Sequence, residues 1–273
     1  MTRSPLGGQI EIAGKQVSRL GLSTMRLTGA CAWGEPNDYG AAVAVLRAAA
    51  DTHGVTYIDT ADAYGPHFAE QLVREALFPY RDEVLVATKV GVVRPTADHW
   101  APLGRPEYLR HAVEGSLRRL DVERLDLCYL HWLDPEVAVA DQIGTLMEMR
   151  AEGKIGHVGV VNATEADLTL AMMHGTIAAV QNRLNLSKEF DPVLDMCATA
   201  GIPYVASRPL NSGKLAADPL KALSWVLARG RHVAAIPATS SLSHLEELVG
   251  AAAGMGADGS TCHMAPPTTP CGP

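Results

Sequence analysis

Short apolar runs alternate with amphipathic stretches along most of the chain. The apolar runs have the pattern of buried strands, and the amphipathic stretches have helical periodicity. Eight runs predict strands, at residues 19–25, 56–61, 84–90, 125–131, 155–161, 178–182, 203–207 and 232–237. Helices are predicted between them, at 39–52, 68–77, 106–120, 137–152, 165–174, 191–200 and 219–229, with a last one from about Ser243.

This alternation predicts an α/β fold. Strands buried on both faces and separated by helices form parallel sheets, and eight such units favour a closed (β/α)8 TIM barrel over an open doubly wound sheet. No GxGxxG turn follows the first strand, which also weighs against the open sheet. Residues 7–17 alternate around a glycine-containing turn and predict an N-terminal β-hairpin that plugs the bottom of the barrel. We assign 1–250 to the barrel and expect 251–273, rich in Ala, Gly, Pro and Thr, to be a disordered tail that buries no face.

Composition narrows the class of protein. The 273 residues are 47% hydrophobic and 19% charged, which suits one large core. The net charge of −7 gives no reason to expect nucleic acid or an anionic membrane as a partner. The five cysteines show no CxxC spacing, so neither a disulfide framework nor a metal site is expected. No signal peptide or membrane span is visible. We expect a cytoplasmic protein, monomeric by default, that acts on a small molecule.

Polar side chains follow the predicted strands at matching positions. In a barrel of this type, catalysis takes place at the carboxyl ends of the strands. Five successive apolar runs end in the polar or ionisable residues Asp59, Lys89, His131, Asn162 and Gln181–Asn182, and Tyr64 lies in the loop after the second run. One such residue would mean little, whereas the whole set indicates a site.

These residue types suit proton transfer. A tyrosine has a pKa near 10 in water, and a cation close to its hydroxyl lowers that value. We therefore expect Lys89, paired with Asp59, to make Tyr64 a usable acid, while His131 donates a hydrogen bond to a carbonyl oxygen or relays a proton. No metal cluster and no activated Cys or Ser nucleophile is apparent, so the electrons must come from a cofactor.

The motifs around these residues resemble those of the aldo-keto reductases, especially a bacterial branch that includes pyridoxal reductase-like enzymes. The resemblance covers about 17–248 in the family's order and spacing. It rests on the sequences of residues 59–65 (DTADAYG), 87–89 (ATK), 127–131 (LCYLH), 152–162 (EGKIGHVGVVN) and 236–241 (IPATSS), and on 25–29 and 33–34 for the branch.

The resemblance implies an NADPH-dependent carbonyl reductase. By position, the family's catalytic tetrad is Asp59, Tyr64, Lys89 and His131, with Tyr64 as the general acid. Further positions correspond to cofactor contacts: Asn162 and Gln181 at the nicotinamide carboxamide, Ser207 and Arg208 where the family stacks an aromatic ring, Thr239, Ser240 and His244 at the 2′-phosphate, and Glu247 near the adenine. A loop before a helix start suits an anion, because free N–H groups point at it.

Some positions depart from the family pattern. Val161 replaces a serine before Asn162, which removes a hydrogen bond worth on the order of 1 kcal/mol. The family commonly has an aromatic residue two positions before a Pro-Leu pair, whereas this chain has Ser207 there. In its place we expect Arg208 to cover either the nicotinamide ring or a phosphate. We expect weak to moderate NADPH affinity and an open pocket, with Trp33, Trp100 and Trp132 as walls. Trp33 and Trp100 are placed in loops after the first and third strands.

Three functions are compatible with these residues. The first is reduction of an aldehyde or ketone to an alcohol, with hydride from the nicotinamide and a proton from Tyr64. The second is an NADPH-binding redox sensor with little turnover. The third is a lyase that forms a Schiff base on Lys89. Asp59, which would keep that lysine charged, weighs against the third.

Overall fold

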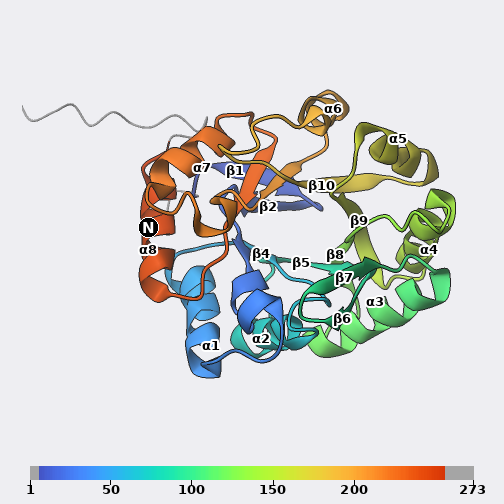
Figure 1. The fold of residues 1–273 in the computed structure, drawn as a ribbon, viewed down its shortest axis with the longest axis horizontal. Helices are drawn as coiled ribbons and strands as arrows, with labels where there is room; N and C mark the ends of the chain where they lie inside the picture. Colours follow the sequence, from blue (N-terminus) through green and yellow to red (C-terminus); the bar gives the residue numbers. More distant parts are fainter. Residues whose placement is uncertain (1–5, 256–273) are drawn as a thin grey trace, which may run out of the picture.

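The computed structural model describes residues 6–255, which form a nearly closed (β/α)8 barrel of eight parallel strands with helices around it (Figure 1). The predicted fold is confirmed. In order across the sheet the strands are β3 (Leu22–Ser23), β4 (Tyr57–Asp59), β5 (Leu85–Val90), β8 (Leu125–Leu130), β9 (Ile155–Val161), β10 (Ile177–Arg183), β11 (Tyr204–Ser207) and β12 (Val233–Ile236).

The barrel closes where the first and last strands meet. Only two residues of the predicted first strand pair with β4, and the rest of that segment reaches across the seam to β12. Ala235 donates its N–H to the Arg19 carbonyl at 2.8 Å and accepts from Gly21 at 2.9 Å. A Cβ at Gly21 would lie 2.8 Å from the Tyr57 ring, so a glycine is needed for this close approach.

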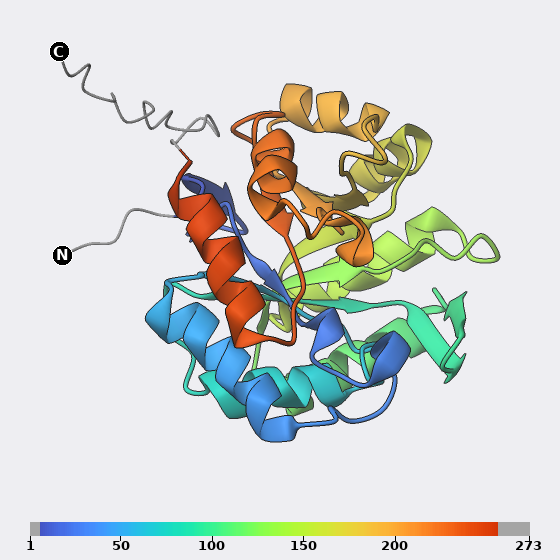
Figure 2. The ribbon, with the colours of Figure 1, turned by 60° about the vertical axis from the view of Figure 1, so that its left-hand side comes forward.

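The helices lie on the outside of the barrel, and α8 lies beside α1 to complete the ring (Figure 2). They are α1 (Tyr39–Arg47), α2 (Phe68–Leu77), α3 (Pro106–Leu120), α4 (Val139–Ala151), α5 (Glu165–His174), α6 (Pro192–Ala200), α7 (Pro219–Leu227) and α8 (Leu242–Ala253). The predicted helix at 39–52 is α1 followed by a π-helical turn, Ala48–Thr52. Several starts are capped by side chains, including Asp38 on α1, Thr164 on α5 and Ser241 on α8.

Two apolar layers hold the barrel. Alternate strand residues face outward under the helices or inward along the axis. The inner layer includes Tyr57, Leu127 and Tyr129, and the N-terminal hairpin, β1 (Gln9–Ile12) and β2 (Lys15–Ser18), packs into it with Ile12 and Val17. The predicted hairpin is therefore confirmed. Its Lys15 donates to Asp126 at 2.8 Å and so ties the hairpin to the start of β8.

Two boundaries differ from the sequence prediction. A second hairpin, β6 (Val92–Thr96) and β7 (His99–Pro102), follows β5 and carries Trp100, which was expected in an irregular loop. At the other end, α8 continues past residue 250, and Ala251, Ala252 and Met255 are buried. The expectation that residues from 251 on bury no face is wrong for 251–255, because α8 runs on to Ala253 and these side chains pack into the core under the helices. Residues 256–273 of the predicted tail lie outside the described part of the chain.

Arg19 is buried at the seam, where its guanidinium binds backbone carbonyls at the ends of separate elements. It donates to the carbonyls of Val233 at 2.8 Å and Gly7 at 3.3 Å, and also to those of Leu227, the last residue of α7, and Gly230. Each buried acceptor that loses its donor costs about 1–3 kcal/mol. Arg19→Met should therefore lower the free energy of unfolding by at least about 3 kcal/mol in urea titrations.

The matched control for this prediction is Arg150→Met. Arg150 is exposed and donates to the Gly156 carbonyl at 2.9 Å, so its loss should change stability by less than about 0.5 kcal/mol. Equal unfolding midpoints for the two variants would show that Arg19 does not hold the seam.

Candidate active site

The four residues predicted as catalytic come from three neighbouring strands and one loop. Asp59 is the last residue of β4, Lys89 lies near the end of β5, and His131 directly follows β8. Tyr64 lies in the loop between β4 and α2. All four are buried, at 0–6% exposure, so the sequence motifs are brought together in one desolvated group.

Lys89 and Asp59 form a fully buried ion pair at the centre of this group. The lysine Nζ donates to Asp59 Oδ1 at 2.6 Å and to the Thr60 carbonyl at 2.8 Å. Burial alone lowers the pKa of Lys89, but Asp59 and Tyr64 outweigh it, and the net pKa of the lysine is raised. Lys89 is therefore charged throughout the neutral range. A buried charge of this kind is tolerated only with a close partner.

Tyr64 lies directly above this pair. Lys89 Nζ is 5.0 Å from the centroid of the tyrosine ring, and the His131 ring is 5.9 Å from it, edge to face. Burial raises the pKa of Tyr64 more than Lys89 lowers it, with a smaller lowering contribution from Arg208. The expectation of a net lowered pKa is wrong, because the desolvation of a fully buried phenol exceeds the effect of a lysine already neutralised by Asp59.

His131 is held neutral. Burial lowers its pKa well below the usual value, and the positive charges of Lys89 and Arg94 add to that effect. Its Nδ1 is buried without a hydrogen-bond partner. A neutral imidazole beside a phenol can donate one hydrogen bond to an oxygen that both side chains reach.

The residues predicted to bind a cofactor lie on one side of the barrel mouth. Asn162, Gln181 and Ser207 come from the ends of β9, β10 and β11, where Gln181 pairs in register with Val161 and Val205. Asn162 is exposed and has a left-handed backbone (φ 55°), a conformation that asparagine tolerates. These ends form a continuous arc with the loop after β12.

Gln181 has a partner that the sequence did not predict. It is 2% exposed, and its Nε2 donates to Asp59 Oδ1 at 2.7 Å, the same oxygen that accepts from Lys89. The other oxygen of Asp59 is buried without a hydrogen-bond partner. The neighbouring Asn182 faces away from the site and bonds to Ala163 and Asp191, which fixes the loop that carries Asn162.

The arc ends at the start of α8 and at Arg208. Ser240, His244 and Glu247 are exposed there, and Ser241 caps the helix by accepting from the His244 N–H. Thr239 is buried and supports the turn through bonds with Ser241. Arg208 is exposed after β11 with a left-handed backbone (φ 51°). A cation and an exposed helix N-terminus on one arc suit an anionic ligand.

The other side of the mouth is aromatic. Trp100 lies 6.4 Å from Tyr64, 6.1 Å from His131 and 6.2 Å from Trp132, measured between ring centroids. Trp33 follows β3, and Arg94 lies against the rings of both Trp33 and Trp100. The predicted tryptophans thus gather at the tetrad. Arg94 was not identified from the sequence, because nothing in the pattern of β6 marks one arginine as buried.

The chain belongs to the aldo/keto reductase family. The family model matches residues 19–221. An uncharacterized oxidoreductase of Schizosaccharomyces pombe is 40% identical over 261 residues, covering 90% of this chain and 85% of that protein. Pyridoxine 4-dehydrogenase of Escherichia coli is 35% identical over 254 residues, covering 85% and 88%. The chain is therefore an oxidoreductase.

Solved aldo/keto reductases share the fold. Glycerol dehydrogenase of Gluconobacter oxydans aligns with a TM-score of 0.78 at 26% identity, covering 89% of each chain. An aldo-keto reductase of Klebsiella pneumoniae in complex with NADPH aligns with a TM-score of 0.71 at 26% identity, covering 92% of this chain and 90% of that one.

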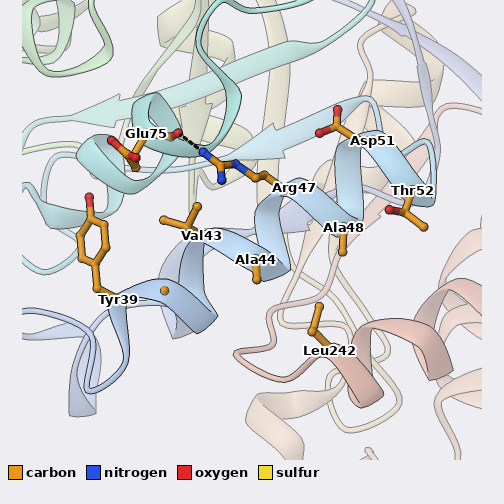
Figure 3. A pocket seen from close by; sticks show the side chains of 10 residues that line it. Tyr39, Val43, Ala44, Arg47, Ala48, Asp51, Thr52, Glu75 and Leu242 are labelled. Atoms are coloured by element: carbon orange, nitrogen blue, oxygen red, sulfur yellow. Dashed lines mark hydrogen bonds between the residues drawn. The ribbon is translucent and has the colours of Figure 1, made fainter.

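A groove of about 570 Å³ lies outside the barrel, away from the tetrad (Figure 3). It is lined by α1, by Glu75 of α2 and by Leu242 of α8, and Arg47 donates to the Glu75 carbonyl at 3.0 Å. None of the predicted site residues lines it.

Within residues 6–255, no cluster of His, Cys, Asp or Glu could hold a metal ion, and no helix is long and apolar enough to cross a membrane.

The low pKa of His131 predicts how stability depends on pH. The unfolded chain binds a proton at His131 below about pH 6.5, whereas the folded protein does not, so acid favours unfolding by up to about 1.4 kcal/mol per pH unit. In His131→Gln this contribution is absent. The free energy of unfolding should then fall less steeply between pH 6.5 and 5 than it does in the wild type.

The control is His174→Gln, which replaces an exposed histidine on α5. Its unfolding free energy, measured in urea across the same pH range, should run parallel to that of the wild type. If His131→Gln also runs parallel, folding does not lower the pKa of His131.

Proposed function

We propose that this aldo/keto reductase reduces an aldehyde or ketone to an alcohol with NADPH. The observation that carries the proposal is the buried Lys89–Asp59 pair beneath Tyr64, with neutral His131 at the side of the phenol. These groups form an acid and a hydrogen-bond donor in a desolvated site. They provide no hydride source, so a bound cofactor must supply it.

The side chains would act on the carbonyl oxygen. The nicotinamide supplies a hydride to the carbonyl carbon when it is bound. Tyr64 donates its phenolic proton to the oxygen that becomes the alcohol, and His131 donates a hydrogen bond to the same oxygen. Lys89 then faces the phenolate that Tyr64 becomes, and its charge stabilises that anion.

The arc from β9 to α8 fits NADPH. Asn162 and Gln181 would hold the carboxamide of the nicotinamide, and Ser207 and Arg208 would lie along the ring and the phosphates. Around the start of α8, the exposed Ser240, His244 and Glu247, together with the buried Thr239, would bind the adenosine and its 2′-phosphate. Support comes from the cation and the exposed helix N-terminus on this arc, and from the NADPH complex of the similar Klebsiella pneumoniae protein.

An aromatic aldehyde is the substrate class that the mouth favours. Trp33, Trp100 and Trp132 offer half-buried ring faces on this side of the mouth, with Trp100 beside Tyr64, and flat rings pack well against such surfaces. The 35% identity to pyridoxine 4-dehydrogenase is consistent with a small heteroaromatic compound. A Schiff base on Lys89 is disfavoured, because that mechanism needs a neutral amine and the pKa of this lysine is raised.

Removal of the phenolic hydroxyl tests this function. Tyr64→Phe should lower kcat for aromatic aldehydes by about 10²–10⁴-fold, the usual contribution of a general acid, as followed by NADPH absorbance. Affinity for NADPH, measured by fluorescence titration, should be unchanged. Equal rates in variant and wild type would contradict the role of Tyr64. Stoichiometric NADPH binding with no turnover of any carbonyl would instead favour a redox sensor.

His244 tests the position of the 2′-phosphate. An arginine is charged at all relevant pH values, whereas a histidine is neutral much of the time at pH 7. His244→Arg should lower the Kd for NADPH by about fivefold, as expected for an exposed ion pair, and leave the Kd for NADH unchanged. The control is His174→Arg on α5. An equal change for both cofactors, or no change, would place the phosphate elsewhere.

A further inference from the structure

Arg94 lies in β6 at the aromatic side of the mouth, and it is only 8% exposed. Among residues 6–255, no carboxylate binds it. Its two Nη atoms instead donate to four backbone carbonyls, at Ala32 (3.0 Å), Ala63 (3.2 Å), Cys31 (3.1 Å) and Ala97 (2.5 Å). A guanidinium has four Nη hydrogens, so this side chain uses its planar fork to join separate segments of backbone.

The joined segments are the loops that form the mouth. Cys31 and Ala32 belong to the loop after β3, Ala63 to the loop after β4, and Ala97 to the turn of the β6–β7 hairpin after β5. Three consecutive strand ends are thus linked through one side chain. Loops at this end of a barrel are otherwise the parts free to move relative to the scaffold.

Both neighbours of Tyr64 in the chain are held by this linkage. The carbonyl of Ala63 accepts directly from Arg94. The N–H of Gly65 donates at 3.0 Å to the Ala32 carbonyl, the same oxygen that accepts from Arg94. The backbone on each side of the acid is therefore fixed relative to β6.

The same guanidinium contacts Trp33 and Trp100, which together form the tryptophan wall of the mouth. Its central carbon lies 3.6 Å from the centroid of the Trp100 ring and 5.3 Å from that of Trp33. Such contacts orient the rings as well as attract them. The wall and the acid thus share one support.

We propose that Arg94 is a positioning residue, which holds Tyr64 and the Trp33–Trp100 wall at the geometry required by an aromatic aldehyde. The proposal rests on the proposed carbonyl reduction. Arg94 itself does not touch the reacting atoms. Its hydrogen bonds keep the loops after β3, β4 and β5 in register, so that the carbonyl oxygen meets the phenol while the ring of the substrate lies against the tryptophans.

The test compares Arg94→Met with Arg94→Lys. Methionine removes both the positive charge and the planar set of N–H donors. Lysine keeps the charge, but its single nitrogen cannot donate to four carbonyls in one plane. Both variants should lose about 10²-fold in kcat/KM for an aromatic aldehyde, the cost of misplacing the reacting groups by about 1 Å. The Kd for NADPH should stay at the wild-type value, because the cofactor arc lies on the other side of the mouth.

Arg81→Met is the matched control. Arg81 is exposed, lies before β5 at the opposite end of the barrel, and donates to the Ala50 carbonyl at 2.9 Å. Its loss should leave kcat/KM unchanged. Wild-type kcat/KM in Arg94→Met, full recovery in Arg94→Lys, or a parallel loss of NADPH binding would each overturn the positioning role.

A second measurement needs no turnover. Quenching of tryptophan fluorescence by acrylamide should increase in Arg94→Met and not in Arg81→Met, because Trp33 and Trp100 lose their support. If the wild type reduces no aldehyde, the proposed function fails. The quenching comparison then decides alone whether Arg94 holds the wall, and unchanged quenching would refute it.

Discussion

The buried ion pair between Lys89 and Asp59 constrains the rest of the site. Both side chains are fully buried, and taking two charges out of water costs several kcal/mol each before their attraction is counted. The pair is tolerated because neighbouring strands, β4 and β5, bring the groups to 2.6 Å, and because Gln181 donates to the same carboxylate from β10. Three strands on two sides of the barrel therefore converge on one oxygen atom.

The mouth of the barrel has two halves, one on each side of this ion pair. The strand order β12–β11–β10–β9–β8–β5–β4–β3 places the polar ends of β9 to β12 on one arc. The loops after β3, β5 and β8, which carry the tryptophans, form the other. Asp59, Tyr64, Lys89 and His131 lie between them, where the proposed hydride donor and carbonyl would meet. Gln181 connects the halves, since it lies on the polar arc and bonds to the tetrad.

The fold, and the grouping of Asp59, Tyr64, Lys89 and His131 at the mouth, could be predicted from the sequence because both rest on local patterns repeated at fixed intervals. A strand that ends in Asp59 or Lys89 places that residue at the mouth whatever the loops do. Contacts between loops have no such period. In the sequence, nothing distinguishes Arg94 from the other residues of its alternating segment. Only the folded chain shows that it donates to the backbone carbonyls of residues 31–32 and 63. The raised pKa of Tyr64 was missed for a related reason, since the sequence shows the cation but not the depth of burial.

That raised pKa changes how the acid is understood. A phenol whose pKa were lowered by a free lysine would be partly ionised near neutral pH and could not always donate. In this site the Asp59 carboxylate offsets much of the positive charge of Lys89. Burial raises the pKa of Tyr64, so the phenol keeps its proton until a stronger base is present. In the proposed reduction, the oxygen of a carbonyl that has accepted a hydride would be such a base. In the proposed reaction the ion pair would therefore stabilise the phenolate after transfer without forming it beforehand, and Tyr64 would keep its proton until then.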